Sequence, residues 1–375
     1  MPSINNVNQG GRVRQPRGIV KVNGVAVPGW IEWEVNNNSH YQADTFRVQF
    51  ALNQLPPDYG AAWWASQTGV SIEIFAGFPP DPESFDISQL KSWIYGNVDE
   101  VDFDPVGTTV TVTGRDLTSL FIDTKTTEAW KDKTSSEIAE LLAARHSLTP
   151  VVTDTDTTAG KIYELDHVHM NDQRSEWDLL TYLAAKEEFV VYVKGQELHF
   201  EPKPLVTDPP YLLQWEPASA DKASPTFNGK AISFTRNLTL AKGIVVTVRS
   251  WNAKQKKGFS ATFPKSAKSI TPGNATNKGG IQNYVFVKAG LDQQKADEFA
   301  QNKHRELTRH EMKLQATLPA DDLLTANCLV QFTGTGTLFD QQYFPDTVVR
   351  RMSVTEGYVM TLNAKNHNTD SETLA

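Results

Sequence analysis

The sequence predicts a β-rich α+β protein in which an α/β segment separates two β regions. Three observations lead to this class. Short stretches with strand-like alternation recur at near-regular spacing over residues 18–125, as in a small barrel or sandwich. Over residues 126–205 the apolar period changes from two to that of a helix. Strand-like alternation returns after a proline-rich connector at residues 202–210.

The totals are those of a globular protein. With 375 residues the chain is long enough for two or three domains with cores of their own. No apolar run approaches the roughly 20 residues of a membrane-spanning helix, so we expect no membrane insertion. The first residues lack the apolar segment of a secretory signal, and Cys328 is the only cysteine. We therefore expect a chain that folds in a cytoplasm without disulfides or a cysteine-based zinc site.

The formal charge of −8 is unevenly distributed. Residues 1–125 carry 8 basic and 14 acidic side chains, and residues 126–205 carry 8 and 15. Residues 206–375 carry 20 and 15, so only this last part is basic. Because nucleic-acid binding depends on neutralising phosphates, the acidic total argues against a general nucleic-acid-binding protein.

Residues 96–121 contain the clearest strand pattern of the chain. A first strand ends in an acidic turn at residues 104–107, and a second strand follows. In that second strand Val110 and Val112 share one face, which is typical of a half-buried strand. The other face carries three threonines: Thr109, Thr111 and Thr113.

The residues around this stretch predict a turn, a cap and a polar arm. We expect the alternation to break at residues 114–116, where Asp116 can cap a short helical turn. Residues 1–17 are polar and predict an arm without a core of its own. Asn23-Gly24 predicts a hairpin turn, and residues 45–52 predict a strand.

The α/β segment carries two helix signals and a hairpin. Thr134 and Glu137 have the spacing of a capping box, which predicts a helix over residues 134–145. Ser175 is expected to begin a second helix, and a hairpin with its turn at Lys194-Gly195 follows.

Strands and one helix are expected beyond the connector. Residues 231–235 and 242–251 alternate as strands, whereas the lysine-rich residues 254–280 predict an exposed loop. Asp292 is expected to cap a helix that ends near residue 310. Closing strands are predicted at residues 313–318, 328–333, 346–355 and 357–364.

Three segments resemble a known family. They are GRDLTSLF (residues 114–121), TSSEIAELLAARHSLTPVV (134–152) and SEWDLLTYLAAKEEFVVYVKGQELHFEPK (175–203). They are similar to the late control protein D family, the baseplate hubs of contractile-tailed phages, which is related to the first part of the VgrG proteins of type VI secretion. The resemblance implies two small tube-type β-barrels and an α/β insert, arranged in a homotrimeric ring that joins a hexameric tail tube to a threefold spike.

The resemblance also implies domains and partners. The domains would be an arm at 1–17, a first barrel at 18–125, a peripheral insert at 126–205, and a second barrel at 206–375 with the helix at 292–310. The partners would be other copies of the chain, the tail tube or its distal initiator, the central spike, the tape-measure protein and the baseplate wedge. DNA would only pass through. The protein would be part of the virion tail, assembled in the host bacterial cytoplasm.

No group of residues predicts catalysis, a metal or a cofactor. The acidic run at residues 99–104 lacks the spacing of a calcium loop and is expected to be a solvated turn. Its carboxylates, or Asp154 and Asp156, could form a glycosidase pair, but nothing supplies the apolar pocket that would raise one pKa. His167 and His169 could face one zinc ion, but no third ligand is near in the sequence. We therefore expect a protein that is not an enzyme.

Two alternatives to the phage hub remain. One is a type VI VgrG-like spike subunit, which is expected to continue into further domains, or a related phage-derived injection particle. The other is a carbohydrate-binding or carbohydrate-active β protein. This second alternative is suggested by the nine tryptophans, with Trp63-Trp64 as a candidate sugar platform. Core or interface packing explains large aromatic residues more often.

Two sets of residues are candidate sites. Thr109, Thr111 and Thr113 are expected to line the channel, in a first barrel whose acidic excess keeps phosphates from being held. Lys254, Lys256 and Lys257 are expected to contact a partner, with a solvated loop as the simpler interpretation. The basic residues 206–375 are expected to meet the acidic part of the next subunit, so that unlike charges guide ring closure.

Overall fold

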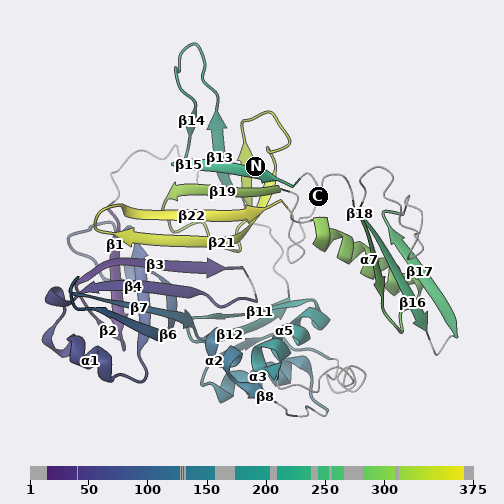
Figure 1. The fold of residues 1–375 in the computed structure, drawn as a ribbon, viewed down its shortest axis with the longest axis horizontal. Coiled ribbons are helices and arrows are strands. Elements are labelled where there is room, and N and C mark those ends of the chain that lie inside the picture. Colours follow the sequence, from purple (N-terminus) through teal and green to yellow (C-terminus); the bar gives the residue numbers. More distant parts are fainter. Residues whose placement is uncertain are drawn as a thin grey trace.

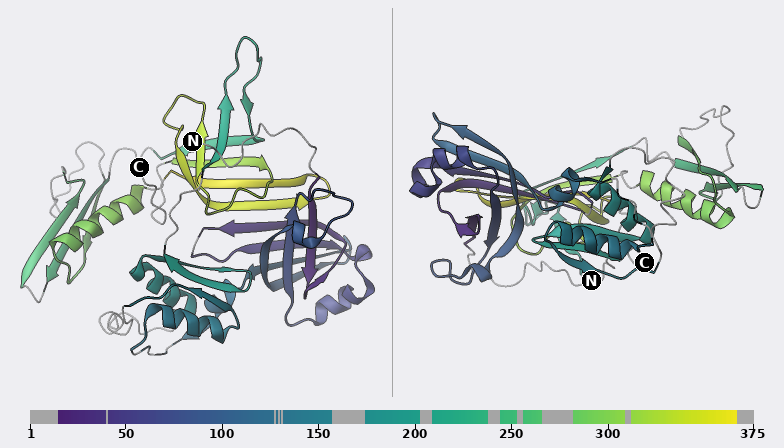
Figure 2. Two further views of the ribbon diagram at one scale, coloured as in Figure 1. Left: turned by 180° about the vertical axis from the view of Figure 1, so that it is seen from behind. Right: turned by 90° about the horizontal axis from the view of Figure 1, so that it is seen from below.

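The computed structural model describes residues 15–39, 41–126, 128, 130, 132–156, 174–202, 209–237, 244–252, 256–265, 282–308 and 312–366. Figures 1 and 2 show a large sheet, an insert of helices and strands against one end of it, and a smaller unit beside it that carries the helix α7 (Gln293–Thr308). Each of these three parts has its own cluster of buried apolar side chains. The expected β-rich α+β class is confirmed.

The first β region contributes seven strands to the large sheet. They are β1 (Arg17–Val22), β2 (Val25–Ala26), β3 (Trp30–Asn38), β4 (Thr45–Ala51), β5 (Ser71–Gly77), β6 (Lys91–Asp104) and β7 (Thr109–Asp116), with the short helix α1 (Ala61–Ser66) between β4 and β5. Asn23 and Gly24 have φ values of 49° and 81° in the β1–β2 turn. This left-handed backbone matches the twist of the flanking strands, so the predicted hairpin is confirmed.

The alternation in β7 continues through Asp116, so the expected break at residues 114–116 is wrong. Gly114 follows Val110 and Val112 onto the buried face, because the strand stays paired with both β4 and β6 to its end. A Cβ on Gly114 would lie 2.1 Å from the Asn97 carbonyl oxygen, which explains the glycine. The N-cap of α2 is Leu117 and not the expected Asp116, but Asp116 closes the turn just before the helix, where the Thr118 backbone N–H donates to Asp116 Oδ1 at 3.0 Å.

The second β region adds seven more strands to the same sheet. They are β13 (Tyr211–Glu216), β14 (Thr226–Phe227), β15 (Ala231–Arg236), β19 (Met312–Pro319), β20 (Val330–Thr333), β21 (Gln342–Ser353) and β22 (Gly357–Lys365). The two regions meet where β21 pairs antiparallel with β3. The result is one 14-stranded sheet, and among the described strands no ladder joins β1 to β3. The division into two barrels stays a prediction.

The insert follows β7 directly. It comprises α2 (Thr118–Asp123), β8 (Lys125–Thr126), α3 (Ser135–Arg145), β9 (Thr149–Val152), β10 (Arg174–Ser175), α5 (Glu176–Glu187), β11 (Phe189–Lys194) and β12 (Glu197–Pro202). Both helix starts are confirmed as capping boxes, at Thr134 and at Ser175. Its core already includes Leu117, so we refer to residues 117–202 as the insert. Trp177 Nε1 donates to the Tyr41 carbonyl oxygen at 3.0 Å, which ties α5 to the loop before β4.

A third unit interrupts the second β region at residues 244–308. Strands β16 (Ile244–Asn252), β17 (Lys257–Phe263) and β18 (Gln282–Val287) form a three-stranded sheet that packs on α7. The expected loop over residues 254–280 is therefore wrong for residues 257–263. β17 forms because its alternate residues Ala261 and Phe263 pack in the core under α7. The expected cap of α7 is confirmed, since the Lys295 N–H donates to Asp292 Oδ1 at 2.9 Å.

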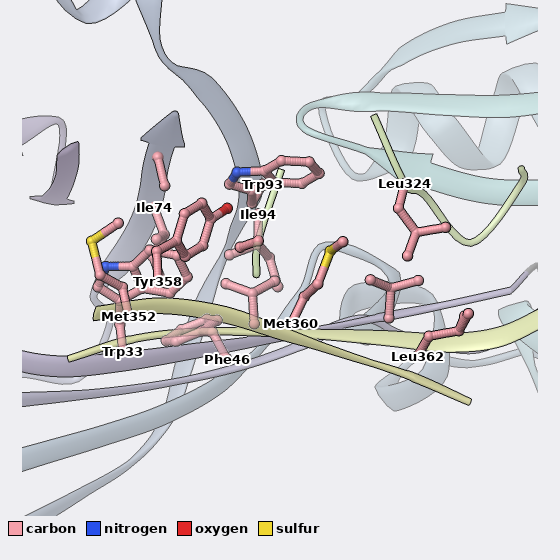
Figure 3. Packing of buried hydrophobic residues seen from close by; sticks show 14 of the residues in the cluster. Trp33, Phe46, Ile74, Trp93, Ile94, Leu324, Met352, Tyr358, Met360 and Leu362 are labelled. Atoms are coloured by element: carbon pink, nitrogen blue, oxygen red, sulfur yellow. The ribbon is translucent and has the colours of Figure 1, made fainter. Parts of the chain in front are cut away.

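The main core lies on one face of the large sheet and joins the two β regions. Figure 3 shows Trp33, Phe46 and Met360, from β3, β4 and β22, among the same side chains as Ile74 and Ile94 of β5 and β6. Each of these side chains is almost fully buried. Since full burial of a large apolar side chain contributes about 1.5–3 kcal/mol, this shared core holds the two β regions together.

Arg350 of β21 lies within this core and is 0% exposed. Its guanidinium carbon is 3.4 Å from the centre of the Trp93 ring, and its nitrogens donate to Asn37 Oδ1 at 3.2 Å and to the Leu324 carbonyl oxygen. Burial lowers the pKa of Arg350. A cation that is taken out of water needs partners of this kind, so Arg350 links β3, β6 and the loop before β20 across the core.

Two carboxyl groups lie near the sheet end that carries the insert. Asp44 accepts from the Asn38 N–H at 2.7 Å and from Asn37 Nδ2 at 2.8 Å, and the Asp116 N–H donates to the Asp44 carbonyl oxygen. Burial raises the pKa of Asp44 to about 6. Burial, and then the charge of Asp44, raise the pKa of Asp116 to about 8. The protonated form of Asp116 is therefore favoured by folding.

The stability of the protein is expected to fall as the pH rises from about 4 to about 8. A carboxyl whose pKa is raised by folding contributes stability that is complete below its ordinary pKa of 3.8 and is lost as the pH passes the folded pKa of about 8. In Asp116→Asn, which keeps the acceptor for Thr118, urea unfolding at several pH values should show a much smaller fall. An unchanged fall in this variant would assign the titration to another group.

Candidate functional site

A single polar face extends across both β regions. It belongs to eight strands that are consecutive neighbours in the order β6, β7, β4, β3, β21, β22, β19 and β15. The register places these residues side by side on the surface opposite the core, and we call them the polar face: Glu100, Asp102, Asp104, Thr109, Thr111, Thr113, Arg115, Thr45, Arg47, Gln49, Glu32, Glu34, Asn36, Thr347, Val349, Arg351, Val359, Thr361, Asn363, Lys365, Lys313, Gln315, Thr317, Ser233 and Thr235.

The three predicted threonines lie together on this face. In β7 they alternate with Val110 and Val112, which are fully buried on the core side, while the threonines remain partly exposed. Their neighbours on β4 are Arg47, Gln49 and Ala51. Phe344, the register partner of Lys365, borders the polar face at the start of β21, and most of the uncharged members of the face are threonine, asparagine, glutamine or serine. Such a surface presents hydroxyl and amide groups to water rather than an apolar patch.

A carboxylate flanked by two arginines crosses the seam between the two β regions. Glu32 of β3 accepts from Arg47 Nη1 of β4 at 2.7 Å and from Arg351 of β21. The hydrogen bond from Arg351 is the largest of the effects that lower the pKa of Glu32. The group therefore stays ionised, and both cations are neutralised within the sheet.

Arg115 neutralises a second acidic cluster at the end of β7. Its guanidinium donates to Asp99 at 2.7 and 2.9 Å and to Asp123 of α2 at 2.9 and 3.2 Å. The hydrogen bonds to Asp99 are the main cause that raises the pKa of Arg115. Together with Glu34, Arg47 and Thr113, this residue lines a shallow pocket of about 320 Å³. Arg115 therefore connects the polar face to the insert, and its positive charge is neutralised by the carboxylates of Asp99 and Asp123.

The acidic run at residues 99–104 is part of strand β6 and pairs with β7, so the expected solvated turn is wrong for all of it except its last residue, Asp104. Asp104 Oδ1 accepts from the N–H groups of Val106 and Gly107 at 2.9 and 2.8 Å and closes the β6–β7 hairpin. Among the described residues no group of three or more histidine, cysteine, aspartate or glutamate side chains could hold a metal ion. On the opposite side of the hairpin, Val101 and Phe103 are exposed although their β7 partners Val112 and Val110 are buried.

The remaining sequence candidates are not brought to this face. Lys256 and Lys257 are exposed in the third unit, at the start of β17, and Lys254 lies outside the described residues. His167 and His169 also lie outside them.

The tryptophan pair does not form a flat sugar platform. Trp64 is buried and packs on Phe50, with ring centres 5.8 Å apart, and Trp63 meets Trp64 edge to face. The pair is therefore part of the core under α1, as expected for large aromatic residues. In the part of the chain that the structure describes, no helix is both long and apolar enough to cross a bilayer.

Sequence reasoning missed Glu32, Arg47 and Arg351. A signal for Glu32 was present, because residues 31–35 alternate aromatic or aliphatic side chains with acidic ones, as β7 alternates valine with threonine. That alternation predicts a polar side of β3. It does not predict that β21, more than 300 residues later, supplies the neighbouring arginine.

The sequence matches no family model and no curated protein. Solved structures are similar over nearly the whole chain. The tail protein from Neisseria meningitidis MC58 matches 94% of this chain and 96% of its own length, with a TM-score of 0.66 and 14% identity. The 43 kDa tail protein of prophage MuSo2 from Shewanella oneidensis matches 93% and 96%, with a TM-score of 0.62 and 13% identity.

A type VI secretion structure is also similar. A chain of the Francisella PdpA-VgrG complex matches 95% of this chain and 59% of its own length, with a TM-score of 0.50 and 9% identity. At such identities the likeness establishes the fold alone. The chain has a fold found in phage tail proteins and shared with the PdpA-VgrG complex, as the resemblance of its three segments predicts.

Proposed function

We propose that this protein is the baseplate hub of a contractile phage tail or of a tail-like particle. In this role three copies form a ring that joins a hexameric tail tube to a threefold spike, and the polar face lines the channel. The fold shared with phage tail proteins supports a structural role in the tail. The single observation that carries the proposal is the continuous polar face, because an inner wall must be wettable along its whole surface while the core stays dry.

The edges of the polar-face sheet support ring formation. Among the described strands, β15 pairs only with β19, and β6 beyond Val98 pairs only with β7. A free strand edge exposes unpaired N–H and C=O groups and tends to be covered or paired. If β6 of one copy approaches β15 of the next, the unpaired N–H and C=O groups of the two strand edges can bond to each other. Three copies then close into a ring in which neither of these two edges stays free.

The charges of the polar face suit a wall that DNA passes without being held. Four of its five cations, Arg47, Arg115, Arg351 and Lys365, are paired with carboxylates of the same chain. A phosphate gains affinity by replacing its counterions with protein cations. Cations that already have carboxylate partners offer little of this gain, so transit rather than binding is favoured.

Within this proposal the partners are those implied by the resemblance: the tail tube or its distal initiator, the central spike, the tape-measure protein and the baseplate wedge. The insert lies outside the ring and contributes little to the channel wall. The protein acts through geometry and not through catalysis.

A trimer is the first expected result. Light scattering at micromolar concentration, with and without a spike partner, should give a particle with three copies of the chain in at least one of the two conditions. A strict monomer in both conditions would contradict the proposal.

The second expected result concerns Thr111. In a Cys328→Ser background, Thr111→Cys should react with a small maleimide in the assembled trimer but much more slowly with a bulky polyethylene-glycol maleimide, because the channel excludes it. Val25→Cys, on the exposed β1–β2 turn, should react with both and serves as the control. Equal rates with the bulky reagent at both positions would remove Thr111 from the channel wall.

A further inference from the structure

The insert and the third unit carry opposite charges. The third unit, residues 244–308, has eleven lysines and arginines and four acidic residues, a net charge of +7 in a chain of −8. The insert, residues 117–202, has eight basic and sixteen acidic residues, a net charge of −8. Surfaces of opposite charge attract one another during association and suppress wrong pairings.

The third unit exposes an apolar patch that lies next to a turn with an exposed lysine. Trp251 at the end of β16 is 60% exposed, and Val287 at the end of β18 is 82% exposed. The two residues lie on the same side of the small sheet, because Val287 is the register partner of Arg249 and Arg249 alternates with Trp251. Lys256 is exposed in the turn that leads from this end of β16 into β17. Lys257 is the register partner of Asn252, so it lies on the other side of the small sheet, with its Nζ 5.5 Å from the centre of the Phe259 ring. A tryptophan in such a position is the kind of side chain that dominates the energy of an interface.

The insert exposes the complementary surface on α3. Leu141 is 43% exposed and shares the outer side of the helix with Glu137 and Glu140. The segment with Asp154 and Asp156 is held beside the start of this helix, because Thr155 and Ser136 exchange backbone-to-hydroxyl hydrogen bonds of 3.1 Å in both directions. We call these residues the acidic α3 surface: Glu137, Glu140, Leu141, Asp154 and Asp156.

The two units are attached to opposite edges of the polar-face sheet but at the same end of its strands. The third unit connects to Arg236 of β15 and Met312 of β19, which are register partners. The insert follows Asp116 at the end of β7, and the intervening registers place these residues at one end of the sheet. Figure 1 shows both units at the right-hand end of the sheet, the insert beside β6 and β7 and the third unit nearer β15.

We propose that the third unit of one copy docks through Trp251, Val287 and Lys256 on the acidic α3 surface of the next copy. This inference rests on the proposed ring: if the β15 edge of one copy meets the β6 edge of the next, the unit carried by β15 lies beside the insert carried by β7. The docking forms a second, outer contact between copies, in addition to the strand edges. Leu141 receives the apolar side chains, and Glu140 and Asp154 face Lys256.

Carbodiimide cross-linking of the full chain tests the contact directly, since this reagent joins lysine amines to carboxylates that touch. Isotopically light and heavy copies are mixed, so that only links between copies contain both labels. We expect mixed links from Lys256 to Glu140 or Asp154. A trimer that gives mixed links only at other sites overturns the docking and leaves the ring standing. A strict monomer overturns both.

Substitutions give an independent measurement by sedimentation equilibrium. Trp251→Ala should weaken trimer formation at least about thirtyfold, as expected for a central interface tryptophan. Lys256→Glu and Glu140→Lys should each weaken it about tenfold, and the two together should recover most of the loss. Lys265→Glu, exposed beyond the other end of β17, is the matched control and should change little. The proposed docking is wrong if the double variant loses as much trimer affinity as the two single variants added together. It is also wrong if Lys265→Glu weakens trimer formation as much as the lysine variant at the proposed contact does.

Discussion

Replacing Arg350 with alanine is expected to lower the free energy of unfolding by about 3–5 kcal/mol. The side chain is fully buried, packs on Trp93 and donates to Asn37 and Leu324. Its removal leaves those acceptors unpaired and opens a cavity between β21 and β6. Urea denaturation followed by circular dichroism measures the change.

Arg351 provides the matched control, because it is the next residue of the same strand but lies on the polar face. Its side chain is 40% exposed and pairs with Glu32, which keeps Arg47 as a second partner. Arg351→Ala should therefore cost no more than about 1 kcal/mol. Arg350→Met keeps the volume without the charge and should be closer to the wild type than Arg350→Ala. Equal losses in Arg350→Ala and Arg351→Ala would show that the buried cation is not a structural link.

Gly114→Ala is expected to destabilise the protein by about 3 kcal/mol. The added Cβ would lie 2.1 Å from the Asn97 carbonyl oxygen, 2.9 Å from the Asn97 carbonyl carbon and 2.5 Å from Phe46 Cζ. The first two contacts are with backbone at the β6 bulge, so relief requires β6 and β7 to separate. Thermal unfolding should shift to lower temperature.

Gly69→Ala is the control for this substitution. A Cβ at Gly69 would meet nothing within 4 Å, and its backbone has no positive φ. Alanine there should be neutral or slightly stabilising, because it restricts the unfolded chain. If Gly114→Ala and Gly69→Ala unfold at the same temperature, the bulge adapts to a side chain. The close approach of β6 and β7 then does not require glycine at position 114.

Local chemistry was sufficient to predict much of this protein from its sequence. The valine–threonine alternation of β7, the capping box at Thr134, the helix start at Ser175 and the cap at Asp292 all depend on residues within a few positions of one another. The structure has each of them in the expected place. For the same reason the three threonines could be assigned to one face before any neighbour of β7 was known.

The tertiary structure alone decided which strands are neighbours. The two-residue period of a strand shows which of its side chains share a face. It does not identify the neighbouring strand, because backbone ladders form equally well between any two strands. The pairing of β3 with β21 therefore escaped prediction, and with it the Glu32–Arg351 ion pair and the continuity of the polar face. β17 was missed for a related reason. The lysines in and around it predicted a solvated loop, and only the core under α7 makes Ala261 and Phe263 part of a strand. Arg350 shows this most clearly. A charged side chain is expected at the surface, but Arg350 is part of the core because the fold brings Trp93 and Asn37 against it from a distant part of the chain.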